Sequence, residues 1–178
     1  MDTNRLSLAL VVSVISAVGL QPASAAEVKP LKVFAVTGEH AGKEVDYAAE
    51  RKEGTTVVLF VNAEQWTRPT ARYLKTLDTQ INKGIPGAEQ AVVVAVWLTS
   101  EPAKIKEYLP KAQQSLDFSK TALTVFEGQV AGPDGWNADI AAHLTVVVIR
   151  DGVEKARFSY RSTNESDVPE VVKALEKK

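Results

Sequence analysis

Cysteine is absent from this sequence of 178 residues. A chain without thiols forms no disulfide and offers no thiolate to act as a nucleophile or a redox centre. Its folded form must therefore be held together by an apolar core, for which a hydrophobic share of 45% is adequate. The absence of cysteine excludes thiol–disulfide exchange and thiol peroxidase chemistry.

An excess of either charge is also missing, because 21 Lys and Arg face 22 Asp and Glu, for a net charge of −1. Such a balance gives no electrostatic attraction to nucleic acid or to an anionic membrane. Histidine is scarce as well, with only His40 and His143, whereas a metal centre usually needs three or four ligands. We therefore expect no metal, no other cofactor and no nucleic-acid partner.

One apolar run without charges is present, over residues 6–20. Arg5 precedes it, and the small-residue pattern Ala23-Ser24-Ala25 follows it. The run is shorter than the roughly 20 residues that span a bilayer, and its flanks are those of a cleaved secretory signal. The alternative is a retained membrane anchor.

We therefore predict that residues 1–25 are a signal peptide and that the mature protein begins at Ala26. The protein would be exported, either periplasmic or secreted, with no membrane insertion after cleavage. Residues 26–178 are enough for one domain with a proper core.

Apolar periodicity in the remaining chain predicts alternating strands and helices. Continuous apolar runs are typical of buried strands, and apolar residues three and four apart predict helices. Pro110 should kink or shorten the second long helix. The expected strands are 31–36, 43–47, 55–61, 91–98, 123–126, 144–149 and 153–160, and the expected helices are 67–84, 101–116, 136–142 and 168–178.

This order predicts a three-layer α/β/α sandwich with an N-terminal β hairpin and a second hairpin at Asp151-Gly152. Functional sites in such sheets lie at the carboxyl ends of strands. The strand that ends at Val61 leads to Thr67, which can cap the following helix, with Pro69 in its first turn.

Four segments resemble the thioredoxin-like superfamily, in particular its exported thioredoxin and peroxiredoxin (AhpC-TSA-type) branch. Trp66-Thr-Arg-Pro-Thr70, directly after the strand 57–61, is similar to the W-C-x-P-C motif of that branch, and Thr67 to Thr70 also fits the peroxiredoxin T-x-x-C. Gly42-Lys-Glu-Val45 resembles its hairpin motif, and residues 144–152 resemble the strand and turn that precede its last hairpin. The similarity spans roughly residues 31–178.

The resemblance implies that Thr67 and Thr70 stand where the redox thiols would be, so oxidoreductase and peroxiredoxin activities are excluded. It also implies that His143 stands where the family has a cis-proline. A cis peptide before a residue other than proline costs about 2.5–4 kcal/mol, so we expect a trans bond at His143 and a reshaped docking edge.

Two interpretations of this region remain open. In the first, Thr67 caps the helix and Thr70 is a small residue that fills space. In the second, the helix start binds an anion or a backbone carbonyl through its free N–H groups and Arg68. The candidate vestigial or ligand-binding residues are Trp66, Thr67, Arg68, Pro69, Thr70 and His143. No catalytic residue is assigned.

The sequence supports three hypotheses of function. The first is an exported, redox-inactive domain that acts as a binding or scaffold module for a protein or peptide partner. The second is a non-thiol enzyme that uses Arg68, Thr70 and His143, which would have to converge on one point. The third is a structural protein of the cell envelope without a small-molecule site.

Overall fold

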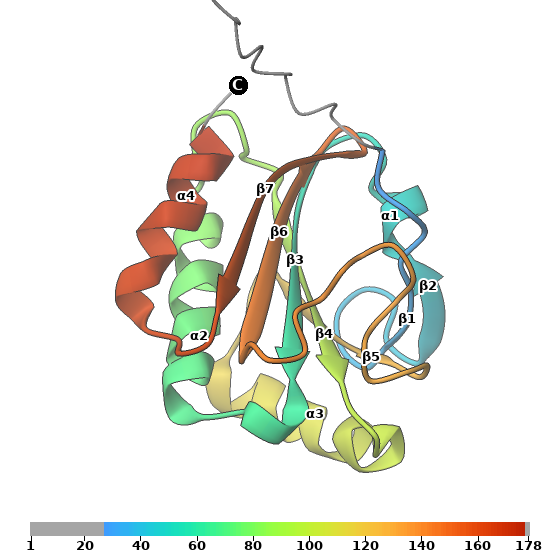
Figure 1. Cartoon of the computed structure of the whole chain (residues 1–178). Coiled ribbons are helices and arrows are strands. Elements are labelled where there is room, and N and C mark those ends of the chain that lie inside the picture. The colour runs from blue at the N-terminus through green and yellow to red at the C-terminus, as the bar shows by residue number, and fades with distance from the viewer. Residues whose placement is uncertain (1–26, 177–178) are drawn as a thin grey trace, which may run out of the picture.

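The structure is a computed structural model that describes residues 27–176 (Figure 1). The predicted signal peptide, residues 1–25, and its cleavage site before Ala26 lie outside the described residues. No helix within 27–176 combines the length and the apolar character that a membrane span requires.

A mixed sheet of seven strands, in the order β2-β1-β5-β4-β3-β6-β7, forms the middle of the molecule. Its three central strands are parallel, and an antiparallel hairpin flanks them on each side. The strands are β1 (Lys32–Ala35), β2 (Lys43–Asp46), β3 (Thr55–Asn62), β4 (Val92–Leu98), β5 (Thr121–Phe126), β6 (Leu144–Arg150) and β7 (Val153–Tyr160).

The central strands are buried on both faces, as their continuous apolar sequences predict. On β3, Val57, Leu59 and Val61 belong to the core on one face of the sheet, whereas Val58 and Phe60 belong to the core on the other. Both sets are no more than 2% exposed. The sheet therefore separates two apolar layers.

The longer helices α2 (Arg68–Asn82), α3 (Pro102–Leu116) and α4 (Val168–Glu176) contribute to one of these layers. The other layer is covered by the four-residue helix α1 (Tyr47–Glu50) and by Trp136 from the loop between β5 and β6. Figure 1 shows α2 and α4 side by side on the left of the sheet and α1 on its right. The predicted α/β sandwich with an N-terminal hairpin is confirmed.

For most helices, strands and turns, the predictions made from the local sequence agree with the structure. The Asp151-Gly152 turn joins β6 to β7, and both residues have positive φ, 52° and 72°, as a tight primed hairpin turn requires. Helix α3 runs through Pro110 without being shortened. Tyr47, expected at the end of a strand, instead begins α1, because the Asp46 carboxylate accepts a hydrogen bond from the Ala49 N–H and caps the helix.

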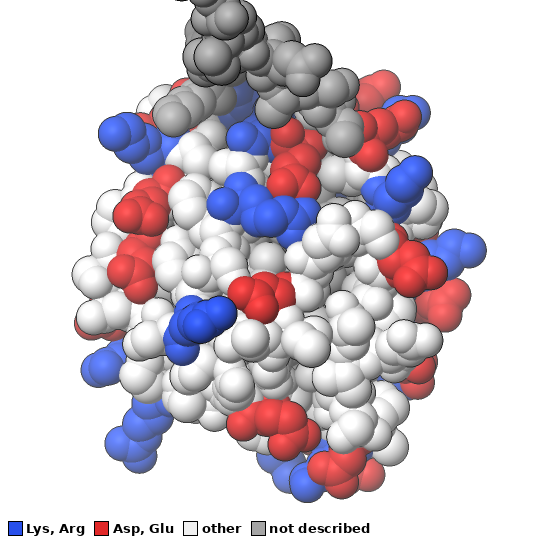
Figure 2. All heavy atoms as spheres, in the orientation of Figure 1, with Lys and Arg blue, Asp and Glu red and all other residues white. Residues whose placement is uncertain are grey.

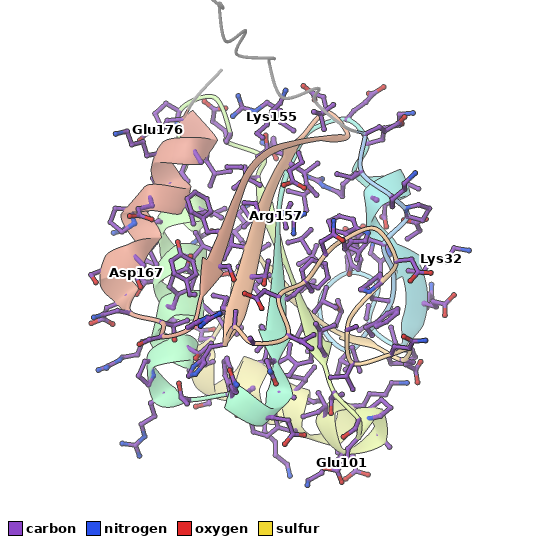
Figure 3. All side chains as sticks on the ribbon, in the orientation of Figure 1. Lys32, Glu101, Lys155, Arg157, Asp167 and Glu176 are labelled. Atoms are coloured by element: carbon purple, nitrogen blue, oxygen red, sulfur yellow. The ribbon has the colours of Figure 1, made fainter. Side chains whose placement is uncertain are left out.

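The helix predicted at 136–142 is wrong, since this segment is an irregular loop. Asn137 has a φ of 47°, which no α-helix accommodates. Tertiary bonds hold the loop instead. The Trp136 indole N–H donates to the Pro30 carbonyl at 3.0 Å. Arg157 of β7, labelled in Figure 3, donates to the Trp136 carbonyl at 2.7 Å. The Asp139 N–H donates to the Thr145 hydroxyl at 3.1 Å.

Candidate functional site

The chain leaves β3 at the carboxyl end of the central strands and enters α2 through a short 3-10 turn, η1 (Ala63–Gln65). Thr67 is the N-cap of α2, and its hydroxyl accepts a hydrogen bond from the Thr70 N–H at 3.5 Å. Pro69 lies in the first turn, where its missing N–H leaves no intrahelical bond unmade. The predicted capping of this helix is confirmed.

Thr67 and Thr70 also join a chain of hydroxyl groups. The Thr67 and Thr70 hydroxyl oxygens are 3.0 Å apart, and those of Thr70 and Thr163 are 2.9 Å apart. The side chain of Thr70 is completely buried, and Thr163, just after β7, is 5% exposed. Thr70 is therefore a hydrogen-bonded interior residue whose hydroxyl faces other threonines.

Trp66, before the N-cap, is half-buried and links three elements. Its ring meets that of Trp97 on β4 edge to face, with the ring centroids 5.3 Å apart. Its indole N–H donates to the hydroxyl of Tyr108 on α3 at 2.8 Å. These contacts fix the start of α2 against β4 and α3.

His143 lies beside the end of β3, as the antiparallel pairing of Val61 with Leu144 requires. Its carbonyl accepts from the Asn62 N–H at 3.2 Å, and its own N–H donates to the Tyr160 carbonyl at 2.9 Å. The described residues contain no cis peptide bond, so the trans expectation at His143 is confirmed. Its Nδ1 atom is buried and has no hydrogen-bond partner within 27–176.

Tyr160, whose carbonyl accepts from the His143 N–H, packs its ring against that of another tyrosine. Tyr73 of α2 and Tyr160 of β7 have ring centroids 5.5 Å apart. Burial raises the pKa of both phenol groups, Tyr73 most strongly. Both hydroxyls therefore stay protonated across the physiological range.

The exposed part of this region contains apolar side chains, the cation Arg68 and the carboxylate of Glu64. Arg68 is exposed and makes no ion pair or hydrogen bond with any residue that the structure describes. Tyr108 is 39% exposed and Ile140 is 59% exposed. The Ile140 carbonyl accepts from the Asn62 side-chain amide at 3.1 Å, which places this loop residue next to the end of β3.

The structure thus brings together residues 66–70 and places His143 next to β3, but no hydrogen bond joins His143 to residues 66–70 within the described chain. A ligand-binding role for Trp66, Thr67, Arg68, Pro69, Thr70 and His143 stays a prediction. Sequence reasoning missed Thr163, Tyr108 and Ile140, since no local pattern connects them to the helix start. Within 27–176, no three His, Asp or Glu side chains cluster in a way that could hold a metal ion.

Comparison with solved structures identifies the fold of this chain. No family model and no curated protein sequence matches the chain. Peroxidoxin BcpB from Mycobacterium tuberculosis matches with a TM-score of 0.60 at 15% identity, covering 85% of this chain and 94% of that one. A secreted disulfide oxidoreductase from the same organism matches with a TM-score of 0.57 at 11% identity, covering 82% and 94%.

The exposed lipoprotein thioredoxin Etrx1 from Streptococcus pneumoniae is also similar, with a TM-score of 0.55 at 14% identity over 82% of this chain and 98% of that one. Such low identities define the fold alone. The chain has a thioredoxin-like fold and contains no cysteine, which confirms the resemblance seen in the sequence. Without cysteine, the chain has no thiol for disulfide exchange.

Proposed function

We propose that this protein is an exported thioredoxin-like binding module that holds a protein or peptide at the surface around the start of α2. We define the α2 N-terminal surface as Trp66, Arg68, Pro69, Tyr108 and Ile140. One observation carries the proposal: of the three large hydrophobic side chains that are exposed within 27–176, two belong to residues hydrogen-bonded to the segment between β3 and α2, Tyr108 to Trp66 and Ile140 to Asn62. Exposed apolar side chains of this kind are typical of protein contact sites.

The charge at this surface favours a partner segment with a carboxylate. The Arg68 guanidinium has no carboxylate partner among the described residues. It also lies at the first turn of α2, where the helix dipole contributes partial positive charge. A carboxylate next to Arg68 would gain a charge-assisted hydrogen bond.

Support for export comes from the signal pattern of residues 1–25. Two of the similar structures are named as exposed or secreted proteins, which agrees with this interpretation. A structural role in the envelope is compatible with the same surface, because a scaffold also needs a contact site.

The enzyme hypothesis has less geometric support. It requires Arg68, Thr70 and His143 to face a common substrate, but Thr70 is completely buried and its hydroxyl contacts Thr67 and Thr163. A substrate would have to open the helix start to reach it. Binding without chemistry therefore suits this region better.

Affinity capture from the native envelope fraction, with the processed protein as bait, tests the proposal. A partner retained by the wild type should be lost with Arg68→Glu and with Ile140→Asp. Lys83→Glu is the matched control, since Lys83 is exposed at the far end of the same helix, about 20 Å away.

With the purified partner, we expect Arg68→Ala to weaken binding about 10- to 100-fold, the scale of a hydrogen bond to a charged group. Thermal unfolding should change little, by about 0.5 kcal/mol or less for an exposed position. Normal capture by both Arg68→Glu and Ile140→Asp would contradict the proposal.

A further inference from the structure

A cavity of about 430 Å³ lies at the opposite end of the sheet from the α2 N-terminal surface. The loop between β1 and β2, together with α1, forms one wall, and the first residues of β4 and β5 form the other. Because β3, β4 and β5 are parallel, the amino ends of β4 and β5 lie at the sheet edge away from Thr67. The volume is in the range of small-molecule sites.

Charged side chains of both signs line this cavity: Glu39, Glu50, Arg51 and Lys120. Glu50 is already paired with the His40 imidazole. Glu39 and Lys120, by contrast, form no side-chain ion pair or hydrogen bond within the part of the chain that the structure describes. The cavity therefore offers one free carboxylate and one free ammonium group.

Arg51 adds a second cation that no carboxylate neutralises among residues 27–176. Its guanidinium donates to the carbonyl oxygens of Gln90 at 2.9 Å and Thr55 at 3.4 Å. These neutral acceptors fix the side chain against the start of β3 and leave its positive charge uncompensated. A positioned cation at the wall of a cavity attracts an anionic group.

Tyr47 supplies a buried donor to the same wall. It is 6% exposed, and its hydroxyl has no hydrogen-bond partner within the described chain. Burial, with further contributions from Glu50 and Glu39, raises the pKa of Tyr47 to about 12. The phenol therefore keeps its proton at neutral pH. An acceptor placed beside it would remove the cost of a buried, unpaired hydroxyl.

We propose that this cavity binds a small zwitterion of the amino-acid type, with its carboxylate at Arg51 and Lys120 and its ammonium group at Glu39. The free charges on the wall include both signs, so a ligand with one charge of each sign matches them. A purely anionic ligand would face the carboxylates of Glu39 and Glu50, and an apolar ligand would desolvate the charged groups without pairing them. The aromatic side chains His40, Tyr47 and Phe118 also line the cavity and suit an apolar amino-acid side chain.

This site is separate from the α2 N-terminal surface, so its test is independent of the proposed function. Titration calorimetry on the processed protein with each of the common free amino acids should identify at least one that binds at submillimolar concentration. The best ligand is then compared with its amide, which lacks the carboxylate, and with its deaminated acid, which lacks the ammonium group. Each analogue should bind at least about tenfold more weakly.

Variants locate the binding site. Lys120→Gln and Glu39→Gln should each weaken binding about tenfold or more. Lys155→Gln on β7 and Glu176→Gln on α4 are matched controls, since neither residue lines the cavity (Figure 3). They should bind like the wild type. Failure of every amino acid to bind at millimolar concentration would overturn the proposal, as would equal affinity for the two analogues.

Discussion

At the scale of single residues, Thr67 and Thr70 have different structural roles. Thr67 is exposed and caps α2, whereas Thr70 is completely buried. A buried hydroxyl group without a hydrogen bond costs free energy, so most are paired. Thr163 provides that partner from the far end of the chain. The start of α2 is thus tied to the segment after β7 by a chain of threonine hydroxyl groups.

Thr70→Val should lower the free energy of unfolding by about 1–3 kcal/mol, because it leaves the buried Thr163 hydroxyl without its partner. Chemical denaturation measures the change. The double variant Thr70→Val/Thr163→Val should lose less than the sum of the two single variants, since removing both hydroxyls leaves neither unpaired. Strict additivity would mean that the two side chains do not interact.

At the scale of elements, the start of α2 combines the helix dipole with a cation and has no thiol. The first-turn N–H groups and Arg68 remain next to Thr67. A group that becomes anionic at this position is stabilised by the helix dipole and by the guanidinium.

A thiol introduced here should therefore be acidic. We expect Thr67→Cys to show a thiol pKa below the usual value of about 8.5, whereas Lys83→Cys, at the other end of the same helix, should show a value at or above it. Thiolate absorbance measured against pH gives both values. Equal pKa values for the two variants would mean that α2 exerts no effective field at Thr67.

At the scale of the whole molecule, the chain combines a thioredoxin-like fold with the absence of the thiols on which redox chemistry in that fold depends. The sheet, the helices and the hairpins follow the thioredoxin-like fold, and the charges are dispersed, with no extended area of one sign on the face in Figure 2. Such a surface agrees with the net charge of −1 and gives no general attraction to polyanions.

The purified protein should neither reduce insulin nor consume peroxide above the buffer control, because it has no thiol to oxidise. An active thioredoxin assayed in parallel serves as the positive control. Activity that persists through repeated purification would show that another group in this fold performs the chemistry.

Processing of the N-terminus is a second prediction at this scale. N-terminal sequencing of protein from the exported fraction should begin at Ala26, because Ala23 and Ala25 satisfy the small-residue requirement of signal cleavage. Protein that begins at Met1 and remains attached to the membrane would instead indicate a retained anchor.

The sequence by itself determined the features that depend on neighbouring residues. Continuous apolar runs identified the central strands, Thr67 and Pro69 identified the start of α2, and Asp151-Gly152 identified the last hairpin. Apolar periodicity and helix caps depend on residues that are close together in the sequence, so they can be recognised without knowledge of the fold. The absence of cysteine, a compositional fact, excluded thiol chemistry outright.

Only the tertiary structure decided which distant residues complete each site. Thr163 is 93 positions from Thr70, and Arg157 is 21 positions from the carbonyl of Trp136 that it holds. Long-range bonds of this kind replaced the expected helix at 136–142 by a loop that inserts Trp136 into the core. The cavity between α1 and the start of β5 likewise exists only because the sheet brings Arg51 and Lys120 together. Such contacts follow from chain packing, and no local pattern encodes them.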